Sequence, residues 1–285
     1  MRLLTWNIQW GRGVDGRVDL ERIVRTARAM ADFDVFCVQE VADNFPGLEG
    51  NDGRDQFAEL GRLLPGYQRI QGYGVDVAGT DARRQRFGNA IFSRYPVLSA
   101  RRHALPWPAD PAKKTMPRVA VEATVRAPFG PLRVVTTHLE YYSDVQRHAQ
   151  VRRLRNLHDE ACQRAMAAAR YENDESNVTF EPTAQTTAAI VCGDFNFPPE
   201  NNARQEMQSP LARGGPALRD AWAHLYREAP HPPTFCVHDE RYAKTPYCCD
   251  FAFVSQDLCA RLRSMIVNTE TRDSDHQPVL IELDD

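Results

Sequence analysis

The sequence predicts an α/β protein in which two β-sheets pack together with helices outside them, as a single domain over residues 1–285. Three observations support this prediction. Strand-like and helix-like segments alternate along the chain, two strand-like segments are joined as a hairpin, and no break in composition separates two domains.

The amino-terminal part contains a strand, a helix and a second strand. Residues 3–8 are strand-like, and residues 19–31 place apolar side chains at helical spacing. Asp19 is the expected N-cap of that helix, because its carboxylate accepts hydrogen bonds from backbone N–H groups of the first turn. Residues 35–38 form a short apolar strand that we expect to end at residues 39–40.

The middle of the chain contains the hairpin. Residues 89–93 are strand-like, and residues 132–139 form a further strand. Residues 118–125 alternate, with Val119, Val121, Ala123 and Val125 on one face. Residues 128–131, Pro-Phe-Gly-Pro, connect the last two strands, and this composition is typical of a turn.

The longest helix is expected at residues 145–170. Its inner stripe consists of Val151, Leu154, Leu157, Ala161, Ala165 and Ala168. Short apolar strands are expected at residues 190–192, 251–254 and 278–280. The proline-rich residues 103–117 and the polar residues 171–187 are predicted to be surface loops.

Composition and charge argue against several classes of protein. The chain is 42% hydrophobic and 26% charged, and its net charge is -3 with a pI near 6.3. A protein that only coats nucleic acid is usually strongly basic. No segment approaches the roughly 18 consecutive apolar residues of a membrane span, and the first residues lack the apolar core of a signal peptide. We therefore expect a cytoplasmic protein.

The seven cysteines have no framework spacing, so we expect reduced, buried thiols. Residue types that bind zinc occur together at Cys236, His238, Cys248 and Cys249. Adjacent cysteines in a strand point to opposite faces, however, and cannot easily reach one metal ion. Buried thiols are therefore the favoured interpretation.

Polar side chains gather where the expected strands end, which is where a sheet presents a site to solvent. These residues are Asn7, Glu40, His138, Asp194, Asn196, Asp250, Asp275 and His276. Alone, each Asp or Asn is typical of a turn, and each His is more often structural than catalytic. Together they supply oxygen ligands for magnesium, a group to orient water and donors for phosphoryl oxygens. That combination is typical of phosphate-ester hydrolysis.

Seven motifs also occur in the order of the signature blocks of a known superfamily. They are Leu4-Thr5-Trp6-Asn7-Ile8, Val38-Gln39-Glu40, the run from Gly88 to Pro96, Thr137-His138-Leu139, Gly193-Asp194-Phe195-Asn196, the run from Asp250 to Ser255, and Ser274-Asp275-His276. With these motifs the chain resembles the endonuclease/exonuclease/phosphatase, or deoxyribonuclease I-like, superfamily. The resemblance implies a four-layer α/β sandwich of two mixed β-sheets packed face to face, and a phosphoric ester hydrolase.

The resemblance also implies a metal site. Glu40 matches the main magnesium ligand, and Asn7 and Asp275 are expected near the same ion. Oxygen and amide ligands, with no cysteine expected in the cluster, favour magnesium, with manganese as its substitute.

The other motif residues match groups that act on water and phosphate. Asp194 matches the carboxylate that orients or deprotonates the attacking water, and Asn196 would hold that site and the phosphate. His276 matches an imidazole that contacts the scissile phosphate, and Asp250 would fix its tautomer and favour its charged form. His138 stands where the deoxyribonuclease and sphingomyelinase branches have His and exonuclease III-type repair enzymes usually have Tyr. The formal general base is left open.

Two departures from the family pattern are present. Cys248 and Cys249 stand where many members have Arg and an aliphatic residue. No clear carboxylate precedes Gly88 to pair with His138, so the role of His138 as an acid for the leaving group stays open.

Asn89, Arg118 and Arg147 are candidates for binding the substrate phosphate, because Arg in particular suits phosphate geometry. A surface salt bridge explains either arginine equally well. Basic segments at residues 83–86, 101–102 and 113–114 would give nucleic acid a basic rim, although solvated loop charge is the favoured interpretation. Trp107 either stacks on a base or packs within its loop.

On this basis we expect a phosphodiesterase or nuclease that acts on nucleic acid. The alternatives are a phosphatase or a sphingomyelinase-like lipid phosphodiesterase, since one fold carries all of these. A non-catalytic binding protein on the same scaffold is a further alternative, which the intact motif residues disfavour. No protein partner is evident in the sequence.

Overall fold

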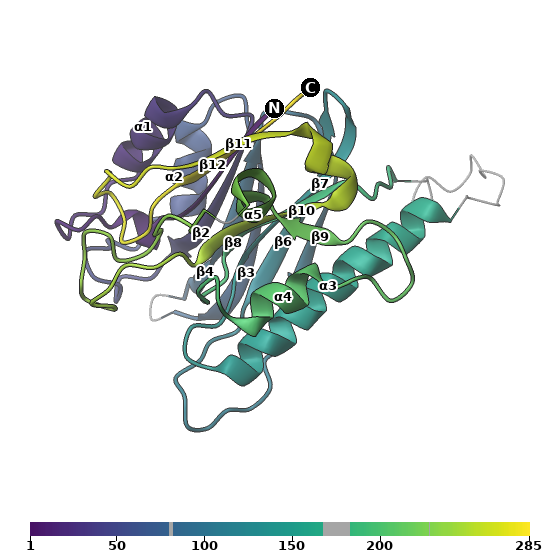
Figure 1. Ribbon diagram of the computed structural model, residues 1–285. Coiled ribbons are helices and arrows are strands. Elements are labelled where there is room, and N and C mark those ends of the chain that lie inside the picture. The colour runs from purple at the N-terminus through teal and green to yellow at the C-terminus, as the bar shows by residue number, and fades with distance from the viewer. Residues whose placement is uncertain (80–81, 168–182, 228) are drawn as a thin grey trace.

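The computed structural model describes residues 1–79, 82–167, 183–227 and 229–285, and its strands form two six-stranded sheets within that part of the chain (Figure 1). The first sheet has the order β11-β12-β1-β2-β4-β3 and the second has the order β5-β6-β7-β8-β10-β9. β1 and β2 are parallel, as are β7 and β8, whereas the other neighbours are antiparallel. Both sheets are therefore mixed, as predicted.

The elements have the following bounds. The first sheet consists of β1 (Arg2–Asn7), β2 (Val35–Asp43), β3 (Gln68–Ala78), β4 (Arg84–Ser93), β11 (Leu262–Val267) and β12 (Val279–Leu283). The second consists of β5 (Val97–Ala104), β6 (Val119–Ala127), β7 (Gly130–His138), β8 (Ala189–Asp194), β9 (Leu218–Asp220) and β10 (Asp250–Ser255). The helices are α1 (Leu20–Met30), α2 (Gln56–Leu63), α3 (Asp144–Met166), α4 (Asn202–Gln208) and α5 (Ala221–Tyr226), with 3-10 turns η1 (Gln9–Gly11) and η3 (Gln256–Arg261).

The sheets pack face to face, and helices cover their outer faces. Alternation along β1 shows the arrangement: Leu3 belongs to the core between the sheets, whereas Leu4 and Trp6 pack in the cluster beneath α1 and α2. On the second sheet, the cluster beneath α3 and α4 contains Val135 and Val151. Figure 1 shows these two helical layers on opposite sides of the sheets. The predicted four-layer α/β sandwich is confirmed.

The predicted helices occur with small changes in their bounds. Asp19 caps α1, because its Oδ1 accepts a hydrogen bond from the Arg22 N–H at 2.8 Å. α3 begins after its cap Ser143 and ends at Met166, four residues before the predicted end at residue 170. Four positions of its predicted inner stripe, 151, 154, 157 and 161, are buried, whereas Ala168 lies outside the described residues. Most of the predicted loop 171–187 also lies outside them.

The prediction that the second strand ends at residues 39–40 is wrong. β2 continues to Asp43, and its register against β4 shifts between Val38 and Val41. Glu40 lies in this bulge with φ 60. A β-bulge leaves one residue out of the ladder and re-aims its side chain, which explains how a partly exposed carboxylate lies within an otherwise buried strand.

The strands that the sequence analysis missed include β3, β5, β9 and β11, which are the four sheet edges. Edge strands carry charged and polar side chains, and therefore lack the apolar pattern of central strands. β5 also includes residues 103–104, which were predicted to belong to the loop 103–117. Within the described residues, no helix is long and apolar enough to cross a membrane.

Gly193 fixes the contact between β7 and β8 immediately before Asp194. Its φ is +129, and a Cβ at this position would lie 2.1 Å from the Thr137 carbonyl oxygen. We expect Gly193→Ala to lower the free energy of unfolding by about 1–3 kcal/mol, because the two paired strands must separate. Urea denaturation measures this loss.

Gly130→Ala is the matched control, since Gly130 also has a positive φ, +119, but its Cβ would meet nothing within 4 Å. Equal losses in the two variants would show that the close approach of the strands contributes nothing beyond the backbone conformation.

Candidate active site

The first sheet brings four of the predicted residues to one edge. β1 ends at Asn7, and its parallel neighbour β2 carries Glu40 near the same edge. Asp275 and His276 immediately precede β12, whose start pairs with the end of β1. The four side chains therefore approach from β1, β2 and the segment that leads into β12.

The second sheet brings the remaining four to the facing edge. The parallel strands β7 and β8 end at His138 and Asp194, which are paired in register. Asp250, at the start of β10, is paired with Asp194. The backbone of Asn196 has φ 54, its N–H donates to Asp194 Oδ1 at 2.9 Å, and its Nδ2 donates to the Leu139 carbonyl at 2.9 Å.

The amide of Asn7 connects the two sheets. Its Nδ2 donates to Glu40 Oε1 at 3.1 Å and to Asp194 Oδ2 at 3.0 Å. His138 spans the same two carboxylates: its Nε2 is 3.4 Å from Asp194 Oδ2, and its Nδ1 is 3.7 Å from Glu40 Oε1. The carboxylate partners of His138 are therefore Glu40 and Asp194, which the sequence analysis did not assign to it.

The pairing of Asp250 with His276, implied by the family resemblance, is present. His276 Nδ1 lies 2.9 Å from Asp250 Oδ2, and the Thr234 hydroxyl donates to the same oxygen at 2.6 Å. Burial opposes a charge on His276, but the carboxylates of Asp250 and Asp194 outweigh it and raise its pKa to about 10. His276 is therefore an imidazolium near neutral pH.

His138 behaves in the opposite way. Burial, the guanidinium of Arg118 and the charge on His276 together hold the pKa of His138 well below its usual 6.5. Its imidazole is therefore neutral near pH 7. The site thus contains one charged and one neutral imidazole, and the difference arises from the groups beside each ring.

The carboxylates of the cluster are crowded and are buried or, for Glu40, mostly buried. Burial raises the pKa of Asp275 to about 7 and that of Asp194 to about 6, and it also raises the pKa of Glu40. The Oε1 atom of Gln9, in the cavity wall, is buried and has no hydrogen-bond partner within the described part of the chain. Crowded carboxylate and amide oxygens are the donors that a hard divalent cation requires. The residues present therefore fit Mg²⁺ or Mn²⁺.

A cysteine also lies in the cluster, so the expectation that none would is wrong. Cys249 Sγ lies 3.6 Å from Asp250 Oδ2 and 3.9 Å from His276 Nδ1. Ligand atoms of Asp194, Cys249 and His276 come within 4.8 Å of one another among the described residues. Because Cys249 is fully buried and Asp250 occupies His276 Nδ1, the oxygen donors around Glu40 suit a metal ion better.

The alternative zinc grouping is not assembled. Cys248 and Cys249 precede β10, and Cys248 packs in the cluster beneath α3 and α4, whereas Cys249 packs with Cys236 in a separate cluster. His238 Nε2 contacts the Thr269 carbonyl oxygen at 2.8 Å instead. The two adjacent cysteines point to opposite faces, as predicted.

The three candidate phosphate-binding residues occupy different environments. Arg118 lines the cavity and pairs with Glu140 at 3.3 Å, while its Nη1 is buried without a hydrogen-bond partner among the described residues. Asn89 lies behind the cavity and donates to the Val119 carbonyl at 2.9 Å. Arg147 does not line the cavity, because its Nη1 donates to the carbonyls of residues 140 and 141 at 2.7 and 2.8 Å.

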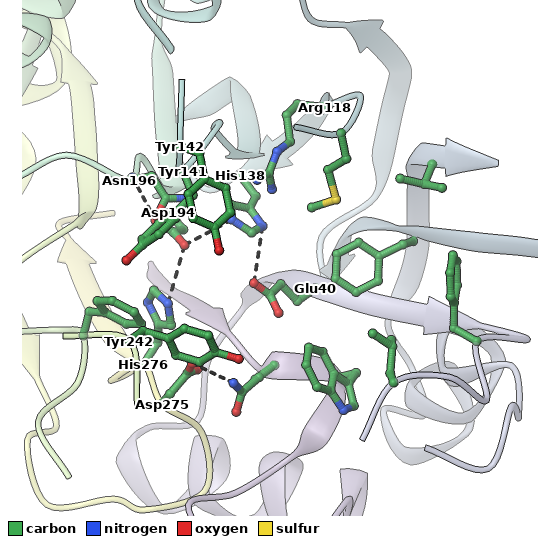
Figure 2. A pocket seen from close by; sticks show the side chains of 18 residues that line it. Glu40, Arg118, His138, Tyr141, Tyr142, Asp194, Asn196, Tyr242, Asp275 and His276 are labelled. Carbon is green, nitrogen blue, oxygen red and sulfur yellow. Dashed lines mark hydrogen bonds and ion pairs between the residues drawn. The ribbon is translucent and has the colours of Figure 1, made fainter. Parts of the chain in front are cut away.

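A cavity of about 400 Å³ lies over the cluster (Figure 2). Figure 2 shows Glu40, Asp194 and His276 facing one another within it. Sequence reasoning missed several of its wall residues, namely Gln9, Tyr141, Tyr142 and Tyr242, and an apolar group described below. The two adjacent tyrosines follow the Thr-His-Leu motif after one residue, Glu140, and this nearness was a usable signal. Tyr242 lies in an irregular segment that gives no periodic signal.

Most arginines of the predicted basic segments contact other groups of the protein. Arg84 pairs with Asp76 at 2.7 Å, Arg86 pairs with Asp43 at 3.5 Å, and Arg102 donates to the Gln71 carbonyl at 2.8 Å. The interpretation as solvated loop charge is wrong for residues 84–86 and 101–102, which lie on β4 and β5. Trp107 is 53% exposed, and its Nε1 donates to Thr115 Oγ1 at 3.0 Å.

Comparisons with known proteins agree with the motifs. The model of the Endonuclease/Exonuclease/phosphatase family matches residues 4–276. Among curated proteins, none matches this sequence.

Several solved structures share the fold. An endonuclease/exonuclease/phosphatase from Beutenbergia cavernae is 22% identical with a TM-score of 0.65, and the match covers 99% of this chain and 71% of that one. Mannosyl-6-phosphatase from Bacteroides thetaiotaomicron is 20% identical with a TM-score of 0.67 over 100% of both chains. The 3′ phosphatase NExo from Neisseria, bound to product DNA hairpin, is 21% identical with a TM-score of 0.60 over 100% of this chain and 99% of that one. At these identities the likeness establishes the fold alone.

The contact between Asp250 and His276 predicts a pH effect. Asp250→Asn removes the negative charge that raises the pKa of His276 most, so this pKa should fall below 10. An NMR titration of the His276 ring in the metal-free protein measures it. If His276 acts as a cation, the alkaline limb of activity moves to lower pH.

Asp220→Asn is the control, because Asp220 makes a comparable pair with His231 at 2.8 Å outside the cavity. An unchanged His276 pKa in Asp250→Asn, or the same shift in Asp220→Asn, would refute the assigned cause.

Proposed function

Because this chain belongs to the Endonuclease/Exonuclease/phosphatase family, whose members hydrolyse phosphate esters, we propose that the cluster around Asp194 is its catalytic site and that it requires Mg²⁺ or Mn²⁺. One observation carries this proposal. Asp194 lies between the Asn7 amide and two imidazoles, with separations of 3.0, 3.4 and 3.6 Å. Its pKa of about 6 suits a group that accepts a proton near neutral pH.

We assign a separate chemical role to each residue of the site. Asp194 orients the attacking water and takes its proton, and the Asn196 N–H holds this carboxylate in place. The His276 imidazolium stabilises the negative charge that develops on the phosphoryl oxygens, and Asp250 keeps it charged. Arg118 offers its unpaired Nη1 to a further phosphoryl oxygen.

Glu40, Asn7 and Asp275 would hold the cation. When bound, a divalent cation acts as a Lewis acid on a phosphoryl oxygen. The neutral imidazole of His138 has one N–H, and its two ring nitrogens face Asp194 Oδ2 and Glu40 Oε1, so it orients these carboxylates. Asn89, on β4, and Arg147, on α3, donate to backbone carbonyls of neighbouring segments, and we expect neither to contact the substrate.

The favoured substrate is a small phosphate ester. Nucleic acid was the expectation from sequence, but Arg84, Arg86 and Arg102 are engaged with groups of the protein. A cavity of about 400 Å³ is in the usual range for small molecules. A panel of sugar phosphates, alkyl and aryl phosphate esters, DNA, RNA and sphingomyelin tests this choice. Turnover of a polymer or lipid well above that of every small ester would overturn it.

The metal site gives a direct test. Glu40→Gln removes one charged ligand while preserving shape, and we expect Mn²⁺ binding, measured by calorimetry, to weaken at least tenfold with the fold retained. Glu21→Gln, on the exposed face of α1, is the control and should bind Mn²⁺ as the wild type does. Full activity after exhaustive chelation would exclude the metal requirement.

The role of Asp194 gives a second test. Asp194→Asn should reduce turnover by about a hundred- to ten-thousandfold, since a positioned base contributes that much. Circular dichroism checks that the fold is kept. In the wild type, activity should fall as the pH drops through the pKa of Asp194, because only the carboxylate accepts a proton. Near wild-type turnover in Asp194→Asn would eliminate it as the base.

A further inference from the structure

One wall of the catalytic cavity is a continuous apolar surface. It consists of Phe45, Leu48, Val75, Phe87 and Met116, and we call it the apolar shelf. All five side chains are partly exposed in the cavity. The rings of Phe45 and Phe87 make an edge contact, with centroids 6.2 Å apart. Contiguous exposed apolar surface beside a polar site is typical of a ligand-binding surface.

The strand order places the shelf on one side of the catalytic cluster. In the first sheet, Asn7 ends β1, Glu40 lies on β2 and His276 lies shortly before β12, and the strands beyond β2 are β4 and β3. Those two outer strands carry Phe87 and Val75. The shelf therefore lies beyond Glu40, on the side away from His276.

The second sheet repeats this order. Its strands run from β6 through β7 and β8 to β10, and Arg118 precedes β6, whereas Asp194 ends β8. Met116 lies two residues before Arg118, so the shelf continues onto this sheet at the end away from Asp194. Figure 2 shows Asp194 and His276 together on one side of Glu40.

This layout determines which part of a substrate meets the shelf. In phosphoryl transfer the attacking and leaving oxygens lie roughly in line across the phosphorus. If Asp194 orients the water and takes one of its protons, the new P–O bond forms on that side. The bond from phosphorus to the alcohol oxygen then breaks on the far side, where the leaving oxygen takes a proton from solvent water. That side is the one that the shelf occupies.

The shelf also determines what kind of alcohol fits. Its side chains carry no N–H or O–H donor, and the neighbouring Trp10 Nε1 already donates to the Glu49 carbonyl at 3.0 Å. A polyhydroxylated sugar or the edge of a nucleobase would therefore lose hydrogen bonds to water without replacement. A hydrocarbon group would instead gain from leaving water.

We propose that this enzyme, given the proposed function on which this inference rests, hydrolyses phosphate esters of hydrocarbon alcohols and binds the leaving alcohol on the apolar shelf.

Two esters of matched shape test the proposal. Cyclohexylmethyl phosphate and glucose 6-phosphate both attach a six-membered ring through a CH₂–O–P link, but only the first ring is a hydrocarbon. Each is assayed as the monoester and as its methyl diester, with Mg²⁺ and with Mn²⁺. We expect kcat/KM to favour the cyclohexylmethyl ester by on the order of a hundredfold, since each buried methylene contributes about fourfold.

Two variants on β3 test whether the preference for the hydrocarbon ester arises at the apolar shelf. Val75→Thr adds a hydroxyl to the shelf with almost no change in volume, and we expect it to reduce the preference for the cyclohexylmethyl ester about threefold to tenfold. Val77→Thr is the matched control, because Val77 is on the same strand, is 45% exposed and does not line the cavity. It should leave the preference unchanged.

The outcomes separate this inference from the proposed function. Hydrolysis of both esters without preference, or faster hydrolysis of the glucose ester, overturns the shelf assignment and leaves phosphate-ester hydrolysis intact. An equal change in the two valine variants also overturns it. No hydrolysis of any of these esters by the wild type, together with none in the wider substrate panel, overturns the proposed function and this inference with it.

Discussion

The parallel pairing of β1 with β2, and of β7 with β8, is the constraint on which the site depends. Parallel neighbours end at the same edge of a sheet, so each pair delivers two polar residues to one place. The antiparallel strands β12 and β10 start at that edge and add residues from the opposite direction. Because the apolar faces of the sheets share one core, the two edges are held against each other, and the Asn7 amide spans the junction.

Charge is distributed unevenly within this junction. The carboxylates outnumber the cationic side chains, and burial raises the pKa values of Glu40, Asp194 and Asp275 because it removes water without supplying enough positive charge. His276 remains charged because it lies against Asp250, whereas burial, Arg118 and His276 together keep His138 neutral. Two identical buried side chains in one cavity thus acquire different chemistry.

The parts of the fold that follow from sequence are those with strong local patterns. The apolar central strands and the capped helix α1 were predictable, since burial on both faces leaves a continuous apolar run. The edge strands were not, because their solvated faces resemble loops. The polar residues at strand ends and their motif order also identified the eight side chains that converge. The prediction that these residues from two sheets form one site rested on the family resemblance and not on periodicity.

Other features depend on tertiary contacts that no local pattern reports. The bulge that turns Glu40 depends on the pairing of β2 with β4. The shelf combines side chains from segments far apart in sequence, and each of them alone looks like ordinary core. Arg147 resembles a phosphate ligand by its type and position, yet its guanidinium is occupied by nearby carbonyls.

Backbone conformations of high energy are concentrated around the cavity. Gln9, Trp10, Glu40 and Asn196 all have positive φ values and all line it. Such residues typically cost of order 1–3 kcal/mol each and persist where the surroundings hold them. The active site is therefore the region where the molecule gives up thermodynamic stability to fix side-chain directions. Selection for heat resistance alone would tend to relax these four positions first, and would erode catalysis while leaving the sandwich intact.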